Sequence, residues 1–103
     1  MVHADIIARV WLYPTARGGR QGPTPRDTFG CLLELNGGCF DCRLLLTEIG
    51  ALSPGQQAEV PIKFLSFNLL KNQLAPGAKF FLRDRTIIAE GEIVKVLAVP
   101  VEL

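Results

Sequence analysis

Cys39 and Cys42 form a Cys-x-x-Cys pair, a spacing that can hold zinc or serve as a redox couple. On a regular strand, residues three apart point to opposite faces, so one metal ion reaches both thiols only if the strand is distorted. Only Cys31 and His3 remain to complete a tetrahedral site. Redox pairs of this spacing usually lie at the start of a helix, and the sequence predicts no helix at Cys39. We therefore expect no metal site, and we interpret Cys31 and Cys42 as small core residues.

Other catalytic groupings are not apparent in the sequence. The single histidine, His3, lies close to the N-terminus, so a Ser-His or Cys-His pair is not expected. Glu90 and Glu92 share one strand face, a spacing that is equally typical of a solvated strand. The sequence has no GxxxxGK[ST] phosphate loop, so GTP binding by this chain alone is not expected. We expect a protein without enzyme activity or cofactor.

Arginines that could bind phosphate are concentrated in two places. Arg17, Arg20 and Arg26 lie in the Gly- and Pro-rich segment 14–26, and Arg83-Asp84-Arg85 follows an apolar pattern. A guanidinium can pair bidentately with a phosphate, and a carboxylate can accept a hydrogen bond from a ribose 2′-OH, so both places are candidate RNA contacts. Alternatively, the first is a structural loop in which Arg20 pairs with an acid of the same chain, and the second is an ordinary solvated turn.

Length and charge limit the classes of function. The 103 residues leave room for about one small domain, and 49% hydrophobic residues are enough for a packed core. The net charge of +1 gives no global attraction to nucleic acid or anionic lipid, so charge-driven binding must be local. No apolar run approaches the roughly 20 residues that cross a bilayer, and no signal-peptide pattern is present. Together with the three cysteines, these features favour a cytoplasmic protein with no membrane association.

The elements that must position these residues are strands. Apolar and polar residues alternate in about six segments, residues 5–13, 28–35, 40–47, 58–64, 79–83 and 87–96. Asn36-Gly37-Gly38 predicts a tight hairpin turn. A change of parity in the last segment predicts a β-bulge between Gly91 and Val94, and residues 68–77 are expected to form a loop. Together, these strand and turn patterns predict an all-β barrel or sandwich.

Several short motifs, in this order, resemble the C-terminal third domain of elongation factor Tu and its archaeal and eukaryotic counterparts. The matching residues are Gly18-Gly19-Arg20-x-x-Pro23 after a first strand, Pro54-Gly55 before a strand, Gly77-x-x-Phe80-x-Leu82-Arg83, and Gly91-x-Ile93 in a closing strand. The resemblance extends over roughly residues 5–97. It implies that residues 1–103 form one stand-alone, six-stranded antiparallel β-barrel of this type.

The resemblance also implies a non-catalytic binding module. In the family this domain contacts the T-arm of aminoacyl-tRNA, the GTPase domain of its own chain and the exchange factor. The tRNA contact involves the final hairpin, so Arg83 and Asp84 occupy matching positions, with Arg85 beside them and with Arg20 and Arg17 as further candidates for binding tRNA or another structured RNA. Gly18, Gly19 and Pro23 match the family's loop and are interpreted as structural residues.

The alternative function is a protein–protein interaction module without an RNA role. An outward apolar set could bury against a translation GTPase, another partner or a second copy of the chain. Its candidate interface residues are Trp11, Tyr13, Phe67 and Phe81, and the same outward set includes Ile7 and Leu65. In the other interpretation of the first strand, Trp11 and Tyr13 pack under segment 14–26 instead.

Overall fold

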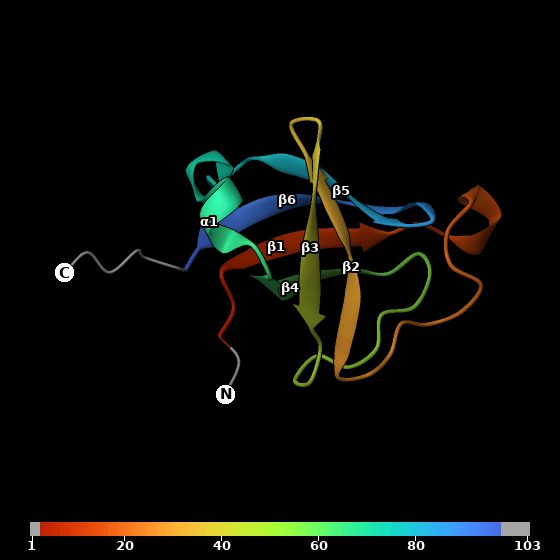
Figure 1. Ribbon diagram of the computed structural model, residues 1–103. Helices are drawn as coiled ribbons and strands as arrows, with labels where there is room; N and C mark the ends of the chain where they lie inside the picture. The colour runs from red at the N-terminus through yellow and green to blue at the C-terminus, as the bar shows by residue number, and fades with distance from the viewer. Residues whose placement is uncertain (1–2, 98–103) are drawn as a thin grey trace.

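The computed structural model describes residues 3–97, which form a closed antiparallel barrel of six strands (Figure 1). The predicted six-stranded β-barrel is therefore confirmed. Residues 1–2 and 98–103 of the predicted domain lie outside the described residues. The strand order around the barrel is β1-β4-β3-β2-β5-β6, and β6 pairs again with β1. The strands are β1 (Ile6–Leu12), β2 (Thr28–Leu35), β3 (Gly38–Leu45), β4 (Gln57–Phe64), β5 (Lys79–Asp84) and β6 (Thr86–Val96).

Alternate residues of the strands fill the interior of the barrel. In β1, the side chains of Ile6, Ala8, Val10 and Leu12 are fully buried, whereas Arg9 between them is exposed. The same period of two runs through β2 and β4, because successive side chains of a strand point to opposite faces. Buried side chains therefore fill the interior as one core cluster, as expected for a small barrel.

The β2–β3 hairpin turns at Asn36-Gly37, as the sequence predicts. Both residues have positive φ, 51° and 82°, the combination that a type I′ turn requires. Leu35 and Gly38 close the ladder, and the register carries Cys31 opposite Cys42 on the inner face. This turn therefore fixes which residues of β2 and β3 point outward.

Two register shifts adapt β6 to its neighbours. Ile7 pairs with Lys95 and Ala8 with Ile93, so Val94 is an extra residue within the predicted bulge at 91–94. The second shift, between β5 and β6, leaves Ile88 as the extra residue and was not evident from the sequence.

The segment predicted as a loop at 68–77 contains helical turns, so that expectation is wrong in part. Helix α1 (Phe67–Leu70) and the 3-10 turn η2 (Lys71–Gln73) lie near the end of β6 that leads to the C-terminus (Figure 1). Leu70 and Leu74 are buried in the main core, which explains why the chain coils here. Among residues 3–97, no helix has the length and apolarity that crossing a membrane demands.

We predict that Gly91→Ala destabilises the fold. The ring of buried Phe80 covers Gly91, and a Cβ there would overlap the ring and lie 2.9 Å from the Arg9 carbonyl oxygen. Overpacking of this kind costs about 1–3 kcal/mol of unfolding free energy. Urea denaturation followed by the fluorescence of Trp11, the single tryptophan, measures the loss. Gly22→Ala, where a Cβ meets nothing within 4 Å, is the matched control, and equal stabilities would contradict the packing described.

Candidate functional site

The first residues of segment 14–26 pack against the barrel. A short 3-10 turn, η1 (Thr15–Arg17), is followed by Gly18 in the left-handed conformation, with φ of 92°. At Gly19 a Cβ would overlap the carbonyl oxygen of Tyr13, so only glycine fits there without a backbone shift. These positions support the structural interpretation of Gly18 and Gly19.

Arg17 is held by two aromatic rings of its own chain. Its Cζ lies 5.1 Å from the centroid of Trp11 and 4.9 Å from that of Tyr13. The two rings meet edge to face, with their centroids 5.1 Å apart. Such cation–π contacts contribute roughly 0.5–2 kcal/mol. Arg17, predicted as an RNA contact, therefore has an intramolecular role in fastening the segment.

Tyr13 is buried, although its ring lies against that of Trp11 and outside the main core cluster. It follows the last residue of β1, Leu12, and its backbone N–H donates to the carbonyl of Ile88, at 2.8 Å. The Tyr13 hydroxyl donates to Oε1 of Glu90 at 3.0 Å. Trp11 and Tyr13 thus pack under the segment, as the alternative interpretation held.

Arg20 joins the segment to the final hairpin. Its Nη1 lies 3.3 Å from Oδ2 of Asp84, 64 residues further along the chain. Nη2 donates to the carbonyl of Pro23, at 3.3 Å, and Cζ lies 4.8 Å from the centroid of Phe29. The ion pair brings together the two arginine-containing places that the sequence singled out, and it matches the interpretation in which Arg20 pairs with an acid of the same chain.

The hairpin between β5 and β6 turns through a single residue. Asp84 pairs with Thr86, and Arg85 between them has a φ of 71°, an uncommon conformation for a residue other than glycine. Arg83 faces outward, and its Nη2 and Nε lie 3.2 and 3.3 Å from Oε2 of Glu34 on β2. Arg85 is exposed and has no ion-pair partner among the described residues 3–97.

Two shallow surface hollows meet at this hairpin, and both are lined by Asp84 and Arg85. The first is completed by residues of β2, β3 and β5: Gly30, Cys31, Leu32, Asp41, Arg43 and Arg83. The second is completed by residues of the segment and of β6: Gly19, Arg20, Gln21, Gly22, Thr86 and Ile88. We call this region the hairpin surface. It presents four guanidinium groups together with carboxylates, a combination suited to a ligand with phosphates and hydroxyls.

Arg43 was not singled out from the sequence, where it lies within the alternating segment 40–47. The feature that could have identified Arg43 is the register of the hairpin, because counting from the Asn36-Gly37 turn places Arg43 opposite Gly30. This pairing becomes visible only once the hairpin is counted residue by residue.

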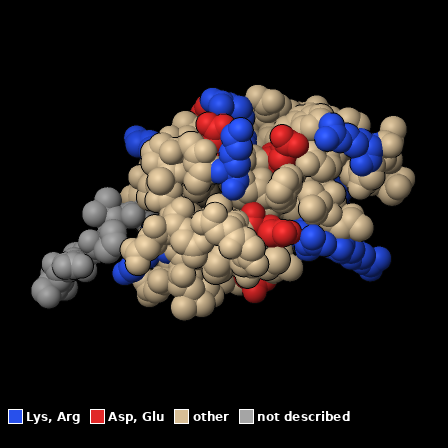
Figure 2. Space-filling view, turned by 90° about the horizontal axis from the view of Figure 1, so that it is seen from above, with Lys and Arg blue, Asp and Glu red and all other residues tan. Residues whose placement is uncertain are grey.

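The charge of the hairpin surface is local. On the face of the molecule seen from above, basic and acidic side chains are interspersed, and no broad field of one sign is visible (Figure 2). This pattern agrees with a net charge of +1. Attraction of a polyanion must therefore depend on short-range contacts.

The cysteines are divided between the two faces of the hairpin. Sγ of Cys31 and Sγ of Cys42 lie 3.7 Å apart in the core, whereas Cys39 is exposed. The hydrogen bond with Cys31, together with burial, raises the pKa of Cys42, so this thiol stays protonated. Among residues 3–97, no three His, Cys, Asp or Glu side chains come together as ligands for a metal ion.

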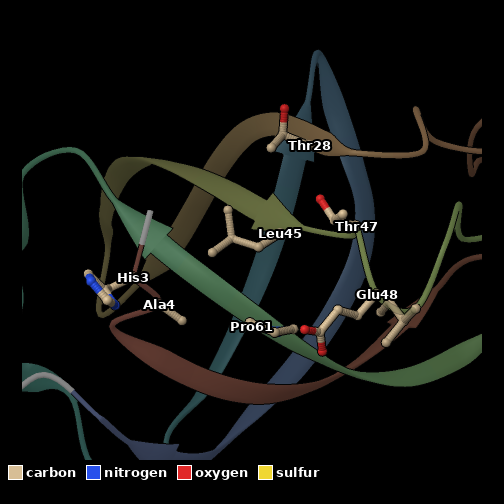
Figure 3. Close-up of a pocket in the computed structure, with 8 residues that line it drawn as sticks. His3, Ala4, Thr28, Leu45, Thr47, Glu48 and Pro61 are labelled. Atoms are coloured by element: carbon tan, nitrogen blue, oxygen red, sulfur yellow. The ribbon is translucent and has the colours of Figure 1, made fainter. Parts of the chain in front are cut away.

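A separate open pocket of about 460 Å³ lies where β3 and β4 diverge (Figure 3). Its lining combines apolar residues and hydroxyls, with His3 and Glu48 as the ionisable groups. His3 and Glu48 lie at opposite ends of the pocket, so imidazole and carboxylate do not form a pair (Figure 3). The pocket therefore offers no acid–base or nucleophilic arrangement of its own.

The residues predicted for a protein interface differ in exposure. Phe67 is partly buried and packs against the core, and Trp11 is partly covered by Arg17. Phe81 remains 43% exposed on the outer face of β5. Among residues 3–97, the most exposed large apolar side chains are Leu69, at 74%, in helix α1, and Leu65, at 58%, just before this helix.

We predict that Glu90→Gln lowers the pKa of Tyr13. Burial, the hydrogen bond to Glu90 and the Glu90 charge all raise this pKa above its ordinary value of 10.0, against a smaller lowering by Arg17. The substituted amide would remove the charge and keep an acceptor, so the pKa should fall while burial holds it above 10. Absorbance at 295 nm reports the phenolate of this single tyrosine.

The raised pKa of Tyr13 also predicts how the stability of the fold depends on pH. Because the pKa of Tyr13 is raised in the folded state, its contribution is fully present below about pH 10 and is lost as the pH rises through the folded-state value. A Tyr13 pKa that Glu90→Gln leaves unchanged would contradict the Tyr13–Glu90 contact.

Comparison with known proteins does not assign the chain to a family. No protein-family model matches the sequence, and no curated protein matches it either. The resemblance to the third domain of elongation factor Tu therefore depends on the short motifs and their order, and membership of that family stays a prediction.

Proposed function

We propose that this chain is a non-catalytic module that binds structured RNA, such as tRNA, through the hairpin surface. The observation that carries the proposal is the convergence of Arg20, Arg43, Arg83 and Arg85 on two hollows that meet at Asp84 and Arg85. Such a module would act in the cytoplasm, without a cofactor and without binding GTP itself.

The side-chain chemistry suits RNA better than a simple anion. Guanidinium groups donate paired hydrogen bonds to phosphates, and the carboxylates of Asp41 and Asp84 can accept from ribose 2′-OH groups. A DNA strand lacks those hydroxyls and would leave the carboxylates facing phosphates. The mixture of charges in the hollows therefore favours RNA over DNA.

Preorganisation also supports the proposal. The ion pairs Arg20–Asp84 and Arg83–Glu34 hold two guanidinium groups in fixed positions while leaving them partly exposed, at 24% and 36% of the side chain. Pairs at this exposure contribute only about 0–1 kcal/mol to stability, so orientation is their larger consequence. Arg83 and Asp84 also occupy the positions that the resemblance to the elongation factor domain implies for tRNA contact.

We predict that tRNA binding weakens as salt is raised and that Arg85→Ala reduces the slope of log affinity against log salt by about 1, because one phosphate contact is lost. Arg83→Ala should lower affinity as well. Arg26→Ala removes an exposed arginine that lines neither hollow, and it serves as the charge-matched control. Filter binding across a salt series gives all four curves. Absence of tRNA binding to the wild-type chain at low salt would overturn the proposal.

A protein-binding module is the second candidate, and the exposed pair Leu65 and Leu69 favours it. A partner translation GTPase or a second copy of the chain could bury these side chains together with Phe81. Sedimentation velocity tests self-association, which Leu69→Lys should abolish, and a wild-type chain that stays monomeric at high concentration would exclude the second copy.

A further inference from the structure

Arg43 lies flat on the backbone of the neighbouring strand. Gly30 is its Cα partner in β2, and both residues belong to the outer face, between inward-facing Cys31 and Cys42 and their neighbours. A Cβ built on Gly30 would lie 2.9 Å from Nη1, 3.2 Å from Cζ and 3.4 Å from Nε of Arg43. Three atoms of one guanidinium at similar distances from a single point mean that its plane faces β2.

The missing side chain at Gly30 makes this orientation possible. Any larger residue would occupy the space in which the guanidinium rests. Nη1 also donates to the carbonyl of Cys42, at 3.1 Å, which holds the group close to β3. Unlike Arg20 and Arg83, Arg43 has no carboxylate partner among the residues that the structure describes.

A guanidinium in this position presents its face to a ligand rather than its fork of N–H groups. Bidentate binding of phosphate uses the edge of the group, whereas unpaired bases of RNA stack on its plane. The neighbouring arginines of the same hollow, Arg83 and Arg85, come from β5 and the turn after it. The hollow therefore places a flat platform beside two groups that can reach phosphates.

We propose that Arg43, seated on Gly30, is a stacking platform for an unpaired base of the bound RNA, with the adjoining phosphates held by Arg83 and Arg85. The inference rests on the proposed RNA-binding function and specifies its ligand: a loop, bulge or single-stranded end rather than a continuous duplex. Asp41 and Asp84 accept from the ribose hydroxyls of the same nucleotides.

Two substitutions that keep the net charge test the platform. Gly30→Ala displaces the guanidinium, and Arg43→Lys replaces its plane with a compact ammonium. Each should weaken binding of an RNA stem-loop roughly tenfold, the size expected for one stacked base. Neither should weaken binding of the same stem closed by an abasic loop. Neither should change the salt slope, since no charge is lost.

Two controls separate stacking from folding. The three atoms nearest to a Cβ at Gly30 all belong to the end of the Arg43 side chain, which can swing away, so Gly30→Ala should keep the wild-type melting temperature. In an Arg43→Ala background, Gly30→Ala should have no further effect on binding, because the group that it displaces is gone.

The outcomes distinguish this inference from the proposed function. If the wild-type protein binds neither the stem-loop nor the stem with the abasic loop, the proposed function and the stacking platform are both overturned. If Arg85→Ala weakens binding while Gly30→Ala leaves the affinity for the stem-loop unchanged, RNA binding stands and the platform is overturned. Equal losses on the abasic and base-containing loops would also overturn it, because stacking requires a base.

Discussion

Closure of the barrel by β6 is the constraint on which the remaining structure depends. This strand, the longest of the six, pairs with β1 along one edge and with β5 along the other. Bulges at Val94 and Ile88 bend and twist it so that both ladders form. The Ile88 bulge lies next to the tight turn at Arg85, and the Ile88 carbonyl accepts the N–H of Tyr13 just beyond the end of β1. Closure thereby brings the start of segment 14–26 beside the final hairpin.

The segment is then fixed by several modest contacts. Thr24 is buried and exchanges two hydrogen bonds of 2.9 Å with the backbone of Leu52, which is itself fully buried. Arg17 rests on Trp11 and Tyr13 at the other end. With both ends fastened, the Arg20–Asp84 pair need supply little stability and can serve to orient a guanidinium. The hairpin surface is therefore a consequence of the fold, and Arg20, Arg43 and Arg83 are held in place without a ligand.

The sequence predicts the parts of this molecule that depend on local periodicity. Alternation predicted the strands, and Asn36-Gly37 predicted the hairpin, because side-chain period and turn conformation are properties of adjacent residues. The short helix at Phe67–Leu70 was missed, since one turn is too short to show a helical period. Whether Tyr13 is exposed or packs under segment 14–26 stayed open, because its cover comes from a loop whose path alternation does not predict.

The candidate site was predicted only in part. The two arginine-containing places were found from composition, but the ion pair that joins Arg20 to Asp84 depends on strand order and closure, which no local pattern reveals. Arg43 depends on a glycine in the opposite strand, so its position required the register of β2 and β3. Residues that act together across strands are the ones for which the sequence carries the weakest signal.

The most direct test of the RNA-binding account is to map the contact surface by NMR. Titrating tRNA into isotope-labelled protein at low salt should shift the Nε signals of Arg20, Arg43, Arg83 and Arg85 and the amide of Thr86. The amides of α1 and of its neighbours Leu65 and Lys71 should stay in place. Shifts confined to the α1 region, or no shifts at any tRNA concentration, would contradict the account.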